Sequence, residues 1–317
     1  MGTVGYLLQL QRPLSCRLCV IAAMLITFPC QAALMPSFQV SGNVGYELAG
    51  IAAPGPPVHG NITLSNIPLG AQIQQVFIYT NDFWSGFSGG GQIDATLTPP
   101  VGPPVNIANN LSPFSSDPVP TAQTFGYKMG APPLSVTGNG SYGISITPSI
   151  VGGNANQMAG AAMLVIYSDP SLPQRTITVN EGVFLMGTNG QSNSNTTTFT
   201  QQTDTIHASA NSQLSILTFA DDFQSGTSEL IKFNGQTVGG PIDANLPGGG
   251  SASIFNIPVT SLAGSVNTAT VTSTGDIFGW HLAVLQTTAV PEPSTFLLAA
   301  LGLTGLMLLA QACRRPQ

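Results

Sequence analysis

The sequence predicts an all-β protein: an antiparallel β-sandwich or jelly-roll-like fold, with two possible related halves, between an N-terminal signal helix and a C-terminal transmembrane helix. Two observations predict the β class. No stretch between residues 34 and 289 keeps the apolar period of an amphipathic helix. Short β-branched or aromatic runs recur there instead, separated by Gly, Pro and Asn. Together with the apolar ends, this divides the chain into three predicted parts, 1–33, 34–289 and 290–317.

The first part, residues 1–33, has the pattern of a secretory signal peptide. Arg12 and Arg17 form a basic region, residues 18–28 form an apolar run, and Ala32 and Ala33 are small residues at a cleavage point. We therefore expect the secretion translocon and a signal peptidase as partners. Residues 34–289 contain no cysteine and must fold without disulfides, because the four cysteines of the chain are Cys16, Cys19, Cys30 and Cys313.

Six runs in the central part are predicted strands. Residues 161–167 are continuously apolar, which predicts a strand buried on both faces, whereas residues 175–180 alternate polar and apolar, which predicts a half-buried strand. Asn234-Gly235 predicts a type I′ hairpin turn, since both residues readily adopt a positive φ. The remaining runs are 73–79, 214–219, 229–233 and 281–285.

A faint internal repeat indicates either a duplication or chance similarity in a Gly/Ser/Asn-rich chain. If the repeat is a duplication, the two halves are 34–150 and 205–289. The matching segments are 80–86 with 220–226, 91–97 with 240–246, and 136–138 with 271–273.

The charge of the central part excludes one class of partner. Residues 34–289 carry 12 acids, which are the 13 of the chain less Glu292, and three bases, so their net charge is −9. Without a basic patch, nucleic-acid binding is not expected. The three bases are Lys128, Arg175 and Lys232.

Four acids in the repeated segments are the candidate chemical groups: Asp82, Asp94, Asp222 and Asp243. Loop carboxylates can hold Ca²⁺, and a pair of carboxylates can hydrolyse a glycosidic bond. An aspartate after a strand also commonly accepts hydrogen bonds from nearby backbone amides. No other cofactor or metal is expected.

Two further patterns have structural alternatives. Tyr79 and Trp84 could form a platform on which a sugar stacks, or they could pack in the core. Residues 86–90 fit the G-x-S-x-G pattern and residues 138–143 fit G-x-G-x-x-G, but neither is followed by the helix that its chemistry requires. We read the second pattern as a turn.

The last 28 residues form a distinct tail. It begins with Val290, Pro291, Glu292, Pro293 and Ser294, continues as an apolar run that predicts a transmembrane helix over 296–312, and ends with a basic stop. Arg314 and Arg315, which form this stop, favour a cytoplasmic C-terminus.

This tail resembles the PEP-CTERM sorting signal of Gram-negative bacteria, because Pro291-Glu292-Pro293, an apolar helix and an arginine pair occur in that order. The resemblance implies processing by an exosortase, a membrane enzyme, in organisms that export polysaccharide. Residues 160–182 are also similar to β-rich modules of bacterial surface proteins, for which no chemistry is known.

Together these features predict an exported, non-enzymatic protein of the cell envelope, the outer surface or the extracellular matrix, in contact with exopolysaccharide or a biofilm matrix. An inner-membrane intermediate would precede the final location. The first alternative is a carbohydrate- or calcium-binding adhesion module. The second alternative is a glycan-active hydrolase.

Overall fold

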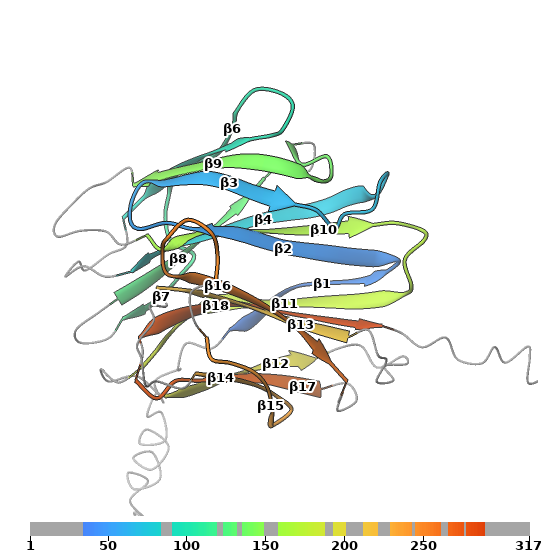
Figure 1. Cartoon of the computed structure of the whole chain (residues 1–317), viewed down its shortest axis with the longest axis vertical. Helices are drawn as coiled ribbons and strands as arrows, with labels where there is room; N and C mark the ends of the chain where they lie inside the picture. The colour runs from blue at the N-terminus through green and yellow to red at the C-terminus, as the bar shows by residue number, and fades with distance from the viewer. Residues whose placement is uncertain are drawn as a thin grey trace, which may run out of the picture. The chain divides into compact units, whose positions relative to one another are not determined.

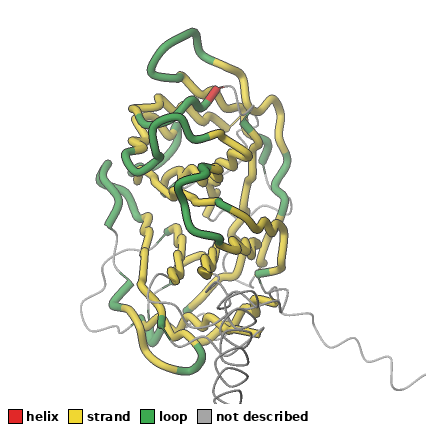
Figure 2. The backbone as a smooth tube through the Cα atoms, turned by 90° about the vertical axis from the view of Figure 1, so that its right-hand side faces the viewer, coloured by secondary structure: helices red, strands yellow, loops and turns green. Residues whose placement is uncertain are grey.

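The computed structural model describes residues 34–83, 91–118, 123–131, 135–148, 158–187, 193–200, 212–220, 229–242, 245–260, 266–275 and 277–288. These residues form antiparallel sheets, which confirms the predicted all-β class (Figure 2). The predicted signal helix and transmembrane helix lie outside these residues. Within the described ranges, no helix has the length and apolar character needed to cross a bilayer.

The first group of strands is a jelly roll. Its inner sheet has the order β2-β10-β4-β8-β7 and its outer sheet the order β3-β9-β5-β6. Eight strands in two sheets with this winding are the defining pattern of a jelly roll, and β7 is an added edge strand. The bounds are β2 Val44–Ala52, β3 Val58–Leu64, β4 Gln72–Phe83, β5 Ile93–Thr98, β6 Val105–Leu111, β7 Ser115–Pro118, β8 Gln123–Gly130, β9 Gly140–Pro148 and β10 Gly160–Ser168.

The second group of strands repeats the same winding. Its inner sheet has the order β1-β11-β18-β13-β16 and its outer sheet the order β12-β17-β14-β15. The bounds are β1 Met35–Gly42, β11 Arg175–Met186, β12 Ser194–Thr200, β13 Ser212–Phe219, β14 Leu230–Phe233, β15 Gln236–Gly239, β16 Ala252–Val259, β17 Val266–Thr272 and β18 Phe278–Thr288.

The two strand orders correspond one to one. Apart from the edge strands β7 and β1, the order β2-β10-β4-β8 of one inner sheet corresponds to β11-β18-β13-β16 of the other, and β3-β9-β5-β6 maps in the same way onto β12-β17-β14-β15. The first group spans 44–168 and the second 175–288 with β1 added from the start of the domain, so both differ from the halves 34–150 and 205–289 suggested by the sequence.

Only one of the three matching sequence pairs lies at equivalent positions. The segment beginning at Thr80 ends β4, and the one beginning at Ala220 follows β13, the counterpart of β4. Asp94 lies in β5, whereas its sequence match 240–246 follows β15, the counterpart of β6. Residues 136–138 precede β9, whereas 271–273 lie at the end of its counterpart β17.

The four sheets stack as layers, with the two inner sheets in the middle (Figure 1). One apolar cluster fills each jelly roll, and a third fills the space between the inner sheets. Leu164 and Ile166 of β10 belong to this third cluster, as do Leu282 and Val284 of β18. The inner sheets are therefore covered on both faces.

This layering explains one success and one failure of the sequence pattern. Strand β10 is buried on both faces, as its apolar run predicts. The prediction that residues 175–180 form a half-buried strand is wrong, because Thr178 and Asn180 are also buried. The Asn180 amide donates to Thr197 Oγ1 and to the Thr198 carbonyl, so an alternating sequence is accommodated on an inner layer by hydrogen bonds to the outer one.

The chain passes between the jelly rolls at one corner. Strand β1 belongs to the second inner sheet and β2 to the first, with Asn43 between them. The other crossing is the turn from β10 to β11. Asn43 bonds this turn, since its carbonyl accepts from Asp169 N at 2.9 Å and its amide donates to Leu172 O at 2.5 Å.

The predicted Asn-Gly hairpin is confirmed. Phe233 pairs with Gln236, and Asn234 and Gly235 have φ values of 49° and 80°. The Asn234 side chain also accepts from Thr268 N, which fixes the turn against β17.

The loop between β15 and β16 reaches the first jelly roll by a contact that only glycine permits. The Pro247 carbonyl accepts from Ala52 N at 2.7 Å. A Cβ on Gly250 would lie 2.0 Å from the Ala53 carbonyl oxygen.

Replacing Gly250 with alanine should lower the free energy of unfolding by about 1–3 kcal/mol, because the added carbon overlaps a backbone oxygen that is held in place. Urea unfolding measures this change. The matched control is Gly130→Ala, where a Cβ meets nothing within 4 Å and the change should stay within about 0.5 kcal/mol. Equal effects of the two substitutions would contradict the contact.

Candidate functional site at the junction of the two jelly rolls

The predicted acidic residues do not come together in the described part of the chain. Asp82 is buried at the end of β4 in an inner sheet, while Asp94 lies on β5 of the outer sheet and accepts from Asn110 N at 2.7 Å. Asp222 and Asp243 lie outside the described residues. Among the described residues, no three His, Cys, Asp or Glu side chains are placed to hold a metal ion.

Tyr79 cannot serve as half of a sugar-stacking platform, because its side chain is fully buried between the inner sheets. Trp84, the other half, lies outside the described residues, as does the whole G-x-S-x-G segment. Of the G-x-G-x-x-G segment, Gly138 and Asn139 form a bend and residues 140–143 already belong to strand β9, so no helix follows it.

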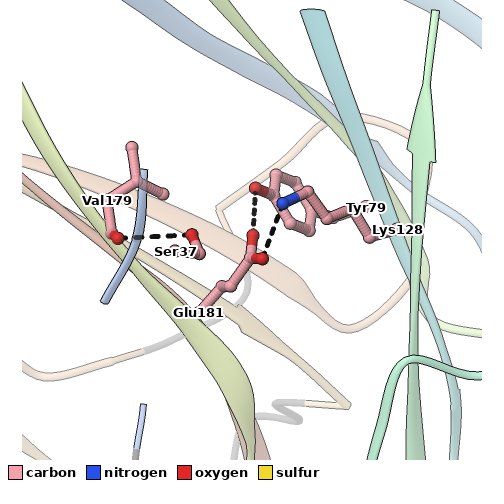
Figure 3. Close-up of polar contacts among 5 residues, drawn as sticks. All are labelled: Ser37, Tyr79, Lys128, Val179 and Glu181. Atoms are coloured by element: carbon pink, nitrogen blue, oxygen red, sulfur yellow. Dashed lines mark hydrogen bonds and ion pairs between the residues drawn. The ribbon is translucent and has the colours of Figure 1, made fainter. Parts of the chain in front are cut away.

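Tyr79 instead belongs to a polar cluster that joins the two jelly rolls (Figure 3). Glu181 of β11 accepts from the Tyr79 hydroxyl at 2.8 Å and from Lys128 Nζ of β8 at 2.6 Å. The Lys128 ammonium also lies 4.1 Å from the centre of the Phe77 ring. Burial and the neighbouring carboxylate raise the pKa of Tyr79, so its hydroxyl stays a donor at neutral pH.

A second polar contact lies between the same two sheets. The Tyr46 hydroxyl of β2 and the Ser215 hydroxyl of β13 are 2.6 Å apart, and Ser215 donates to Asn256 Oδ1 at 2.5 Å. Burial is the largest influence on Tyr46 and raises its pKa. Both polar clusters therefore fix the register of the inner sheets, and neither presents a reactive group to a ligand.

His281 is the third polar group at this junction. Its ring is 1% exposed and meets the Phe219 ring edge to face at 5.0 Å. Gly126 and Gly279 leave the space that it occupies, since a Cβ on Gly279 would lie 2.6 Å from Nε2. Burial lowers the pKa of His281 to about 3, so the imidazole is neutral at physiological pH.

The junction also forms a shallow surface pocket of ≈ 290 Å³. The end of β2, the following prolines and β3 form most of its wall, and Pro247 and Gly248 of the other jelly roll complete it. The exposed side chains of His59 and Asn61 reach it from β3. This pocket is a candidate binding site formed by described residues.

Reasoning from the sequence missed this pocket. Its only local signal is a proline-rich turn, Pro54 to Pro57, with a histidine and an asparagine at alternate positions of the strand that begins at Val58. The contribution of Pro247 comes from a residue far along the chain and has no local signal.

Comparisons with known proteins give two matches to family models. A family model described as a protein of unknown function, DUF3344, matches residues 37–288. The model of the PEP-CTERM protein-sorting motif matches residues 289–315. No curated protein matches the chain.

Two solved structures from infectious bursal disease virus show weak similarity. The VP2 subviral particle is 12% identical with a TM-score of 0.20, and the match covers 87% of this chain and 49% of that one. The Gt strain structure is also 12% identical with a TM-score of 0.22, and the match covers 83% of this chain and 71% of that one. The chain thus spans about half of the first structure, and scores this low do not establish a shared fold.

Removing either partner of the Lys128–Glu181 pair should destabilise the protein. Glu181→Gln and Lys128→Met should each lower the free energy of unfolding by about 1–3 kcal/mol, and the double variant should lose less than the sum, because each single variant leaves a polar group without its partner. Urea unfolding of the four proteins gives the coupling. Lys232→Met, on an outer sheet, is the control substitution of a lysine away from the junction. Additive effects of Glu181→Gln and Lys128→Met would show that the ion pair contributes nothing to the free energy of unfolding.

Acid should weaken the fold through His281. Because its folded-state pKa lies below 6.5, the unfolded chain binds the proton more strongly, and stability should fall as the pH decreases from 6.5 toward about 3. The slope should approach about 1.4 kcal/mol per pH unit. Asp117 acts in the opposite sense at low pH, since burial raises its pKa.

Two measurements isolate the histidine. His281→Gln should flatten the stability profile between pH 6.5 and 5, while His59→Ala should leave it unchanged. In the wild-type protein, the ring resonance of His281 should not move over that range. A ring that titrates near pH 6.5 would show that the junction is open to water.

Proposed function

The chain belongs to the DUF3344 family of proteins of unknown function, and we propose that it is a non-enzymatic protein of the outer envelope or extracellular matrix that associates with exopolysaccharide. Its PEP-CTERM motif marks it as an exported protein that an exosortase handles at the membrane. Beyond this sorting, we propose the outer location, the association with a matrix and the non-enzymatic role.

One observation carries the proposal: the folded family domain and the sorting motif are contiguous. The family match ends at residue 288, where β18 also ends, and the sorting motif begins at residue 289. A cut beside Pro291-Glu292-Pro293 would therefore remove none of the strands that the structure describes. The double jelly roll is then the form that acts after processing.

The geometry of the described residues supports a binding or structural role. Glu181 and Lys128 are engaged with each other at the junction, Asp94 binds a backbone amide, and His281 is buried and neutral. None of these groups is arranged as a nucleophile with an accessible base. A surface of uncharged polar side chains suits contact with hydroxyl-rich polymers.

Replacing Pro291, Glu292 and Pro293 with alanine should leave unprocessed protein in the inner membrane, because the sorting motif is lost. Fractionation and intact mass of the protein measure this outcome. Pro103→Ala with Pro104→Ala, in an exposed loop before β6, is the matched control. An unchanged mass and location in the first variant would contradict the sorting role.

The matrix association is tested in a strain that cannot make its exopolysaccharide. The processed protein should then appear in the medium instead of in the matrix fraction. Retention at the same level without the polysaccharide would overturn this part of the proposal.

A further inference from the structure

We propose that the pocket at the junction of the two jelly rolls binds a ring of a neutral saccharide. This rests on the proposed association with exopolysaccharide and names the site and the class of sugar. The pocket replaces the platform of Tyr79 and Trp84, since Tyr79 is buried.

The walls of the pocket suit the apolar face of a sugar ring. Pro54, Pro57 and Pro247 line it together with Ile51 and two alanines, so carbon-bound hydrogens of a ring can pack against carbon. Prolines have few conformations to lose on binding, which lowers the entropic cost of the contact. The volume, ≈ 290 Å³, lies near the lower end of the range of about 300–1,000 Å³ that is typical of small-molecule sites, and suits a ligand of one or two rings.

The polar groups at the rim suit sugar hydroxyls. His59 and Asn61 point outward from alternate positions of β3 and are both exposed. The structure shows no hydrogen-bond partner for either side chain among the described residues. An imidazole and an amide offer both donors and acceptors, which is what vicinal hydroxyls require.

The charge of the site selects a neutral sugar. No Asp, Glu, Lys or Arg side chain lines the pocket. The net charge of −9 over residues 34–289 disfavours an approaching anionic polymer. Uronic acids and phosphorylated sugars are therefore expected to bind poorly.

The outer sheet extends the site beyond the pocket. His59 pairs with Ser145, Ser145 with Thr96, and Thr96 with Asn106, so one row of polar side chains crosses four strands. All four point to the solvent-facing side, with Ser145 partly covered. A saccharide chain with one ring in the pocket can continue along this row.

Both jelly rolls are needed to build the pocket. A Cβ on Gly248, which has a φ of 123°, would lie 2.0 Å from the Ala52 carbonyl oxygen, so a glycine brings this wall against β2. The bond from Ala52 N to Pro247 O holds it there. The pocket is therefore a property of the paired jelly rolls.

The test uses the processed protein isolated from the producing cells. The probes are an array of neutral oligosaccharides of glucose, galactose, mannose and N-acetylhexosamines, and a matched set of uronate oligosaccharides. At least one neutral probe should bind, and His59→Ala with Asn61→Ala should weaken that binding at least tenfold. The control Thr198→Ala, an exposed residue of the second outer sheet, should bind as the wild type does.

A second readout reports the site directly. Of the three histidines, His59, His207 and His281, only His59 should shift its ring resonances when the bound probe is added. Unchanged affinity in the double variant, equal binding of uronates, or no binding to any neutral probe would overturn the pocket assignment. If the double variant is still retained in the matrix of the cells, the assignment of sugar binding to this pocket is wrong, whereas the proposed association with exopolysaccharide is not contradicted.

Discussion

The apolar contact between the two inner sheets is the interaction on which the remaining structure depends. Each inner sheet already covers the core of its own jelly roll, and the third apolar cluster covers its other face. Strands β10 and β18 are consequently buried almost throughout. Separating the jelly rolls would expose these faces to water, so we expect the pair to unfold together although residues 34–289 contain no cysteine.

Polar groups at this contact determine how the two sheets align. A purely apolar interface is non-directional, whereas Tyr79, Lys128 and Glu181 require one relative position to make their bonds. Two of the three bases in residues 34–289 lie at the junction: Lys128 in the ion pair and Arg175 at the crossing into the second jelly roll. Of these two, Lys128 makes the ion pair that requires one relative position of the inner sheets.

The sequence predicted a structural element correctly where the element depends only on residues close to one another along the chain. The apolar run 161–167 and the Asn234-Gly235 turn each depend on neighbours along the chain, and both are confirmed. The burial of Thr178 and Asn180 was not predicted. Asn180 bonds Thr197 of another sheet, and the alternation of polar and apolar residues along β11 does not indicate that a second sheet packs against it. The shared strand order of the two jelly rolls coincided with a sequence match only at the ends of β4 and β13, since the other equivalent strands keep their order without keeping their residues.

The candidate site was less predictable than the fold. Acidic and aromatic residues drew attention to Asp82 and Tyr79, yet both are buried in the inner sheet. His59 and Asn61 lie on an edge strand, where exposed polar residues are common. They become part of a candidate binding site only because Pro247 of the other jelly roll completes the wall of the pocket beside them. Such a site is formed by tertiary packing, so it cannot be predicted from the types of residue and their spacing along the chain.

The position of β18 has a mechanical consequence. It runs between β11 and β13, with antiparallel hydrogen bonds along both edges, and its last residue adjoins the C-terminal tail. A force applied through that tail pulls the strand along its own axis, so the two rows of bonds resist together in shear and do not open one at a time. A protein tethered at this end would place tension on its most deeply held strand, which suits a molecule exposed to flow.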